Sequence, residues 1–197
     1  MREKEAELLL VAAHLLDYPS KQTIEMVQEW INTSNHWSME RNQLQLLIRP
    51  FQMMSFIELE KLYVNTFDLK AEIGLYLTAY EVGDSNKRGA SLIQLQKIIN
   101  QAGFERNDKE LADYIPMLYE LIAIMEETDD AIRLWKRLGT VTQTIYQNIP
   151  KTNLYFPIFE LLMTYVFEAP SDKELEEMER NRETTDLAEL PYPIMYN

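Results

Sequence analysis

Cysteine is missing from the chain, and histidine and glycine are scarce. The absence of cysteine excludes disulfides, thiolate zinc sites, iron–sulfur clusters and a cysteine nucleophile, and it fits a reducing cytoplasm. Neither His14 nor His36 has a glutamate three residues before it, so the Glu-x-x-His pairs of a di-iron bundle are missing. The dispersed glycines form no phosphate-binding loop. We therefore expect no metal site, no stably bound cofactor and no enzyme activity.

Positive charge is in short supply as well, because 32 acidic residues outnumber 19 basic ones and leave a net charge of −13. The acidic residues are concentrated between residues 168 and 189. Such a surface repels nucleic-acid phosphates and anionic membranes. It favours a basic or amphipathic peptide as a partner, although an acidic C-terminal region would serve solubility alone equally well.

The chain also has no apolar run of the length that a membrane span needs. Residues 154–167 are strongly apolar, but they include Glu160 and fall short of the ~20 residues that a helix needs to cross a bilayer. The N-terminal apolar run follows alternating acidic and basic residues and precedes no small-residue cleavage site, which is not the pattern of a signal peptide. We expect no stable membrane insertion and a cytoplasmic location.

The sequence does contain many apolar residues at helical spacing. With 46% hydrophobic residues and no convincing strand, the chain predicts an all-α fold, a compact single-domain multi-helix bundle of about 8–10 helices. We assign residues 1–184 to this domain and residues 185–197 to an extended C-terminal tail. The first helix, residues 3–16, is apolar almost all round and should lie near the middle of the bundle.

Several residues mark where the helices begin and end. Ser55 with Glu58, and Ser171 with Glu174, have the spacing of capping boxes. Pro50 is expected to interrupt the third helix, because proline removes a backbone donor. The other expected boundaries are caps at Thr128 and Asn153 and stops at Gly83 and Gly103.

The most distinctive pattern is in residues 63–89, with the order Y-x-x-x-F-D, a leucine-rich segment and then G-D-S-x-x-R-G. Two weaker motifs match at residues 15–19 (L-L-D-Y-P) and 110–116 (E-L-A-D-Y-I-P). Over the first two-thirds or so of the chain, these residues resemble the nitrate reductase delta-subunit family of molybdenum-cofactor assembly chaperones, the NarJ family. Its better-known members carry H-V-H-G where Tyr80 and Val82 replace both histidines. The positions that match the main motif are Tyr63, Phe67, Asp68, Leu75, Leu77, Gly83, Asp84, Ser85, Arg88 and Gly89.

The resemblance implies an all-helical cytoplasmic chaperone that is not part of the finished enzyme. Family members bind the apo catalytic (alpha) subunit of respiratory nitrate reductase, chiefly its N-terminal segment. They keep it competent for molybdenum-cofactor insertion before it docks on its membrane subunit. Contact with cofactor-delivery proteins stays open, as does the choice between a monomer and a weak dimer.

Other functions also stay open at this point. The nearer alternative is a chaperone for another molybdoenzyme, of the dimethyl sulfoxide or trimethylamine oxide reductase type, that binds a twin-arginine signal peptide. A helical nucleotide-binding protein or a hydrolase is a more distant alternative, since the chain offers no catalytic constellation. A tethering adaptor needs only a groove, so the sequence does not distinguish it from a chaperone.

We expect the client segment to lie in a groove beside residues 63–89, because tyrosine rings are enriched at recognition surfaces. Ordinary core packing is an equal alternative for each ring. Arg88 can either contact the client or pair with a local acid such as Asp68 or Glu81. The expected groove lining is Tyr63, Phe67, Leu75, Tyr76, Tyr80 and Tyr119. The residues expected to shape the turn or meet the client's charges are Asp68, Gly83, Asp84, Ser85, Arg88 and Gly89.

Overall fold

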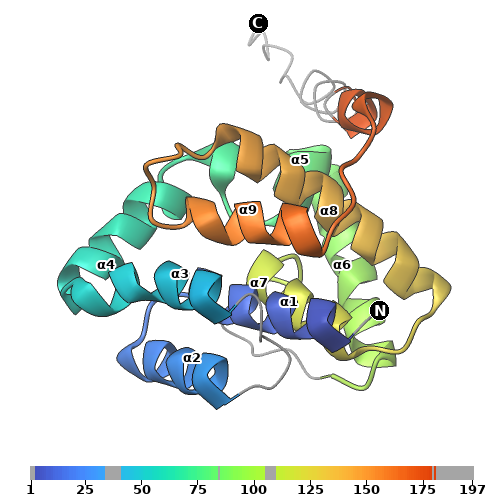
Figure 1. Ribbon diagram of the computed structural model, residues 1–197. Coiled ribbons are helices and arrows are strands. Elements are labelled where there is room, and N and C mark those ends of the chain that lie inside the picture. Colours follow the sequence, from blue (N-terminus) through green and yellow to red (C-terminus); the bar gives the residue numbers. More distant parts are fainter. Residues whose placement is uncertain (1–2, 34–40, 84, 105–109, 179, 181–197) are drawn as a thin grey trace, which may run out of the picture.

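A computed structural model describes residues 3–33, 41–83, 85–104, 110–178 and 180 (Figure 1). These residues are mostly helical and contain no strand, which confirms the all-α prediction; an isolated bridge joins Tyr76 to Tyr114. None of the helices in this part of the chain is long and apolar enough to span a bilayer. The predicted tail, residues 185–197, lies outside the described residues. The named elements are α1 (Glu3–Leu16), α2 (Lys21–Thr33), α3 (Arg41–Met53), α4 (Phe56–Tyr63), the π turn η1 (Val64–Asp68), the 3-10 turn η2 (Ala71–Ile73), α5 (Leu77–Val82), α6 (Asn86–Gln101), α7 (Ile115–Ile124), α8 (Asp129–Asn148) and α9 (Phe156–Tyr165).

Helix α1 lies in the middle of the bundle, as its apolar sequence predicts. Leu9 and Leu16 are fully buried, and the helix packs mainly against α7, with α2 and α9 as further neighbours (Figure 1). Because both α1 and α7 are apolar on most sides, they form the inner layer that the other helices cover. The chain leaves this core after α1 at Asp17, whose side chain is exposed.

Helix α8 shows the amphipathic pattern that the sequence predicts. Its cap is Thr128, whose hydroxyl accepts a hydrogen bond from the backbone N–H of Ala131 (3.2 Å). Leu134, Leu138 and Val141 on its inner face are fully buried, and the helix packs against α9, α5 and α7. The apolar stripe therefore determines which side of α8 faces the core.

Helix α9 begins later than predicted, because Asn153 does not occupy its cap position. The Asn153 side-chain carbonyl accepts a hydrogen bond from the N–H of Tyr155 (2.9 Å), and the Asn153 backbone carbonyl accepts one from the N–H of Phe156 (3.1 Å). These bonds close a turn before the helix. Tyr155 therefore takes the cap position.

Both predicted capping boxes are present. The N–H of Ser55 donates to the Glu58 carboxylate (3.1 Å), and the N–H of Glu58 donates to the Ser55 hydroxyl (3.4 Å). Ser171 and Glu174 make the same pair of hydrogen bonds before a helical stretch at residues 172–178. Each box satisfies two backbone donors that the first turn of a helix leaves free.

The two predicted glycine stops are confirmed, but the prediction for Pro50 is wrong. Gly83 (φ 58°) and Gly103 (φ 81°) have the positive φ that favours glycine after a helix. Helix α3, in contrast, continues through Pro50 to Met53. Pro50 lies in the last turn, where its ring removes one donor, while its carbonyl still accepts a hydrogen bond from the N–H of Met54 (3.2 Å).

Candidate functional site

The aromatic residues predicted to line a groove lie mainly in the core beside α9. Tyr63, Phe67 and Tyr155 pack edge to face, with ring centroids 5.1 Å, 6.2 Å and 4.8 Å apart. Five of the six side chains predicted to line the groove face the interior, so they do not line an open groove in this conformation. Burial is favourable for such large apolar and aromatic side chains, because it removes their surface from water. The exposed fractions are 5% for Tyr63, 4% for Phe67, 2% for Leu75, 3% for Tyr80 and 0% for Tyr119, whereas Tyr76 is half-buried.

The hydroxyls of the three buried tyrosines that were predicted for the groove find partners inside the protein. The Tyr63 hydroxyl bonds to that of Tyr114 (2.9 Å), and the Tyr119 hydroxyl bonds to that of Thr142 (2.5 Å). Tyr80, which replaces a histidine of the resembled motif, donates to the Gly74 carbonyl (2.9 Å). Burial raises the pKa of Tyr63 and of Tyr119. These side chains therefore stay neutral and serve the packing of the core.

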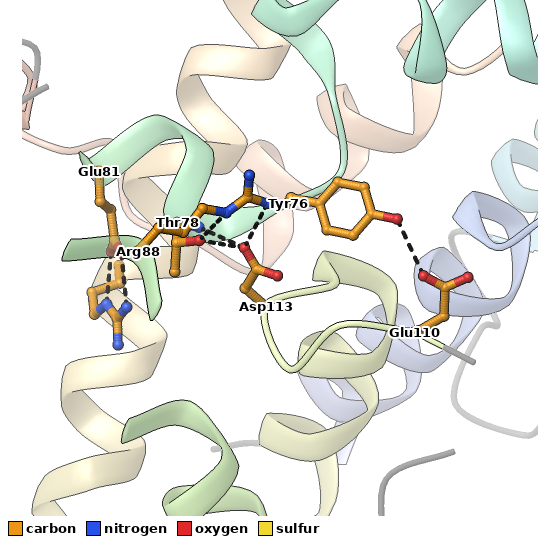
Figure 2. Close-up of polar contacts among 7 residues, drawn as sticks. Tyr76, Thr78, Glu81, Arg88, Glu110 and Asp113 are labelled. Atoms are coloured by element: carbon orange, nitrogen blue, oxygen red, sulfur yellow. Dashed lines mark hydrogen bonds and ion pairs between the residues drawn. The ribbon is translucent and has the colours of Figure 1, made fainter. Parts of the chain in front are cut away.

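Tyr76 is the exception among the six, because it is half-buried and lies at the edge of the core. Its hydroxyl donates to the Glu110 carboxylate (3.2 Å), as Figure 2 shows. Burial, together with the negative charge of Glu110, raises the pKa of Tyr76 to about 12. Tyr76 therefore holds Glu110 by a hydrogen bond at ordinary pH.

The predicted turn residues have different surroundings. Gly83 ends α5 with a positive φ (58°), and Asp84 lies outside the described residues. The buried Ser85 precedes α6, and its backbone carbonyl accepts a hydrogen bond from the N–H of Arg88 (2.9 Å). Asp68 and Gly89 are both exposed, and a Cβ at Gly89 would meet nothing within 4 Å. Gly83 and Ser85 thus shape the turn, whereas Gly89 has no packing requirement for glycine.

Arg88 pairs with Asp113, which is neither of the two nearby acids, Asp68 and Glu81, that were suggested as examples of its partner. Its Nη2 lies 3.5 Å from Asp113 Oδ2, and its Nε donates to the Thr78 hydroxyl (3.1 Å). The Thr78 hydroxyl in turn donates to the same Asp113 oxygen, so the three side chains form one cluster (Figure 2). Asp113 is fully buried. We call these three residues the Arg88–Asp113 clip.

Glu81 does not reach Arg88 because it faces α8. Its two carboxylate oxygens accept hydrogen bonds from Arg137 Nε (2.7 Å) and Nη2 (2.8 Å). This bidentate geometry is the strongest form of an ion pair between these side chains. It ties α5 to α8 and leaves Arg88 for the clip.

The clip fixes the segment that precedes α7. Backbone bonds reinforce it on both sides: Leu77 N–H donates to Asp113 C=O (2.9 Å), and Ile115 N–H donates to Leu75 C=O (2.9 Å). Glu110 and Tyr114, which lie on this segment, are thereby held at a defined place beside α1. In the sequence, Asp113 is marked only as the aspartate of the E-L-x-D-x-x-P motif, which does not identify its partner.

Beside this segment is a cavity of about 310 Å³ between the ends of α1 and α6 and one face of α7. Its apolar lining comes from the last turn of α6, from Phe104 and from α7. Three carboxylates, Asp17, Glu110 and Glu120, share the cavity with this apolar surface. The lining residues are Asp17, Ile99, Phe104, Glu110, Tyr114, Pro116, Met117, Glu120, Leu121 and Ile124.

All three carboxylates have defined partners, and that of Glu110 is the Tyr76 hydroxyl described above. Asp17 accepts hydrogen bonds from the Tyr114 hydroxyl (3.0 Å) and from the N–H of Tyr18 (2.8 Å). Glu120 lies 3.4 Å from His14 Nδ1. Burial raises the pKa of Glu120, whereas the coulombic effect of His14 lowers it. A partly desolvated carboxylate of this kind is stabilised when a cation approaches it.

A second hollow of about 550 Å³ continues the first one, because Phe104 and Ile124 line both. Ile98, Ala102 and Met125 add apolar surface, and Glu126 and Asp130 add carboxylates at its far end. We call the two hollows together the α6–α7 groove. It has an apolar floor and acidic ends, which suits an amphipathic basic helix.

The groove combines apolar side chains with separate carboxylates. In the part of the chain that the structure describes, no group of three or more histidine, cysteine, aspartate or glutamate side chains is placed to hold a metal ion. Ile124 is 55% exposed although α7 is otherwise largely buried. An exposed apolar side chain beside carboxylates suits contact with an apolar, positively charged surface.

Comparison with known proteins adds an independent observation. The sequence model of the family described as nitrate reductase delta subunit matches residues 35–145. A Bacillus subtilis protein named as a probable nitrate reductase molybdenum cofactor assembly chaperone, NarJ, is 30% identical over 152 residues, 76% of this chain and 82% of that protein. The chain belongs to the nitrate reductase delta subunit family. The NarJ chaperone of Escherichia coli K12 is 23% identical over 176 residues, 86% of this chain and 74% of that protein.

The match places most of the site within the region shared by this delta-subunit family. Residues 35–145 include Arg88 and Asp113 of the clip as well as α6 and α7, whereas Asp17 lies outside. Sequence reasoning missed the groove in this family member. The available signal was that α7 is apolar on nearly every side, which leaves apolar side chains such as Ile124 with no place in the core.

Proposed function

We propose that this member of the delta-subunit family is an assembly chaperone for nitrate reductase that supports molybdenum-cofactor insertion. The names of its relatives support the enzyme and the cofactor. The observation that carries the recognition step is the α6–α7 groove, where an apolar floor ends in carboxylates on both sides. A chaperone needs such a surface to hold an apolar client segment and release it later.

The proposed client is the apo catalytic (alpha) subunit, and the proposed contact is its N-terminal segment. In this account the chaperone acts in the cytoplasm, before the alpha subunit docks on its membrane subunit, and does not stay in the finished enzyme. Cofactor insertion then takes place in the client, and the chaperone itself binds no cofactor stably.

The dimensions of the groove suit one short helix. The ten residues of α7 extend for about 15 Å, the length of roughly three helical turns. An amphipathic client helix would place its apolar face on Leu121 and Ile124, and its cations near Glu120 at one end and Asp130 at the other. A dissociation constant between about 1 μM and 1 nM, or −8 to −12 kcal/mol, would hold the client and still permit its release.

The test is a calorimetric titration with a synthetic peptide of the host's alpha-subunit N-terminus. We expect saturable binding that Ile124→Glu weakens at least about tenfold, because the variant replaces an apolar contact of about 1.5–3 kcal/mol with a charge. Ile93→Glu is the matched control, since Ile93 is an exposed isoleucine (71%) on the adjacent helix α6 that lines neither hollow.

The other outcomes separate the alternatives. A scrambled peptide that binds as well as the true one would contradict sequence-specific recognition. Binding of a twin-arginine signal peptide instead of the alpha-subunit peptide would favour another molybdoenzyme as client. Equal loss of affinity in Ile124→Glu and Ile93→Glu would remove the α6–α7 groove from the account.

A further inference from the structure

A third hollow, about 580 Å³ in volume, lies between the start of α1, the end of α7 and the start of α8. Three alanines line part of this hollow, and larger side chains line the rest. Trp135 is held on one side by Phe167, with ring centroids 5.0 Å apart, so it forms a fixed wall. We call this hollow the Trp135 cavity. Its lining is Glu3, Glu5, Ala6, Ile122, Ala123, Met125, Glu127, Ala131, Ile132, Trp135 and Lys136.

The Trp135 cavity has room for a bulky apolar side chain. Ala6, Ala123 and Ala131 leave space that larger residues would fill, and the volume lies within the ~300–1,000 Å³ of sites that bind small organic groups. Ile132 remains 44% exposed beside it. Covering this apolar surface would remove it from water, which favours binding of an apolar group.

Two observations connect the Trp135 cavity to the α6–α7 groove. Met125 lines both the cavity and the second hollow of the groove, so a bound chain that passes over Met125 reaches both. The charges also agree: Glu3, Glu5 and Glu127 outnumber Lys136 around the cavity, and the groove ends in carboxylates too. Both surfaces therefore favour the same positively charged, apolar partner.

We infer that the Trp135 cavity is a second anchor site for the client chain, one that takes an apolar side chain close to a positive charge. This inference rests on the proposed function. The client segment then extends beyond the ten residues that would cover α7 and passes around Met125 to the far side of that helix. Two anchors on one chain raise the affinity, because binding at the first holds the second nearby.

The test uses two nested alpha-subunit peptides that begin at the same N-terminal residue. One has about 12 residues and the other about 24, or ~18 Å and ~36 Å as helices. We expect the longer peptide to bind at least about tenfold more tightly. Ala131→Phe, which fills the cavity, should remove this advantage and leave the short peptide unaffected. Ala90→Phe, on the exposed side of α6, is the matched control and should change neither affinity.

Trp135 fluorescence gives a second readout in a chain whose other tryptophans, Trp30 and Trp37, are replaced by phenylalanine. The long peptide should shift the emission of Trp135, and the short one should not. Equal affinities for both peptides, or no effect of Ala131→Phe on the longer one, would overturn the second anchor and leave the groove in place. Silence from both peptides would overturn the client assignment itself, and the inference with it.

Discussion

At the scale of single residues, the most consequential contact is the buried ion pair of the Arg88–Asp113 clip. Arg88 comes from the G-D-S-x-x-R-G motif and Asp113 from the segment before α7. Asp113 has no exposed side-chain surface, so its charge depends on Arg88 and on the hydroxyl and N–H of Thr78. Arg88 of the motif that carries the family resemblance therefore has a structural role, because it holds the segment before α7 through Asp113.

We predict that Asp113→Ala lowers the free energy of unfolding by about 3–5 kcal/mol, since the loss of one partner leaves the other charge uncompensated. Urea unfolding followed by circular dichroism measures this change. The control is Asp130→Ala, which removes an exposed pair with Arg133 (2.5 Å). Exposed pairs contribute about 0–1 kcal/mol, so similar losses in the two variants would contradict a buried clip.

At the scale of elements, the sequence predicted helices better than it predicted what surrounds them. Residues 3–16, the capping boxes and the stripe on α8 follow from local periodicity and caps, which act within a few residues. Pro50 was misjudged because its cost depends on its place in the last turn of α3. The start of α9 was misjudged because Asn153 first closes a turn.

The candidate site was harder to predict for a physical reason. Periodicity tells which face of a helix is buried, but not which helices meet, and the α6–α7 groove combines the end of α1 with α6 and α7. Tyr63 and Tyr80 have the composition of a recognition surface, yet their burial is decided by tertiary packing. A structural partner was one of two alternatives for Arg88, but Asp113 lies too far along the chain for local spacing to identify it.

The contact between α8 and the residues after α9 gives a prediction at this scale. Gly139 is buried in α8, where an added Cβ would lie 3.3 Å from Cδ1 of Phe167. We expect Gly139→Val to destabilise the protein by about 1–3 kcal/mol, because the extra methyl groups overpack this contact. Gly139→Ala should cost less, since alanine gains about 0.5–1 kcal/mol of helix stability that offsets the close approach.

The thermal unfolding of both variants checks this account. Phe167→Leu is the second-site control, because a smaller side chain opposite Gly139 should reduce the penalty of valine. A Gly139→Val variant as stable as the starting protein would show that the α8 contact tolerates displacement.

At the scale of the whole molecule, the acidic charge and the helical core have separate roles. A net charge of −13 opposes nucleic acid and anionic membranes, while the acids of the α6–α7 groove favour a cationic client. The buried aromatic core beside α9 gives the helices fixed positions. The chain thus combines a packed helical core with an exposed apolar groove, the kind of surface that the proposed chaperone function requires.

The central claim is tested most directly by the molybdenum content of the alpha subunit isolated from host cells with and without this chain. Our account predicts that deletion lowers the molybdenum bound per alpha subunit. The starting sequence and Ile93→Glu should restore it, and Ile124→Glu should not. An unchanged molybdenum content after deletion would contradict the chaperone function, whatever the chain binds in isolation.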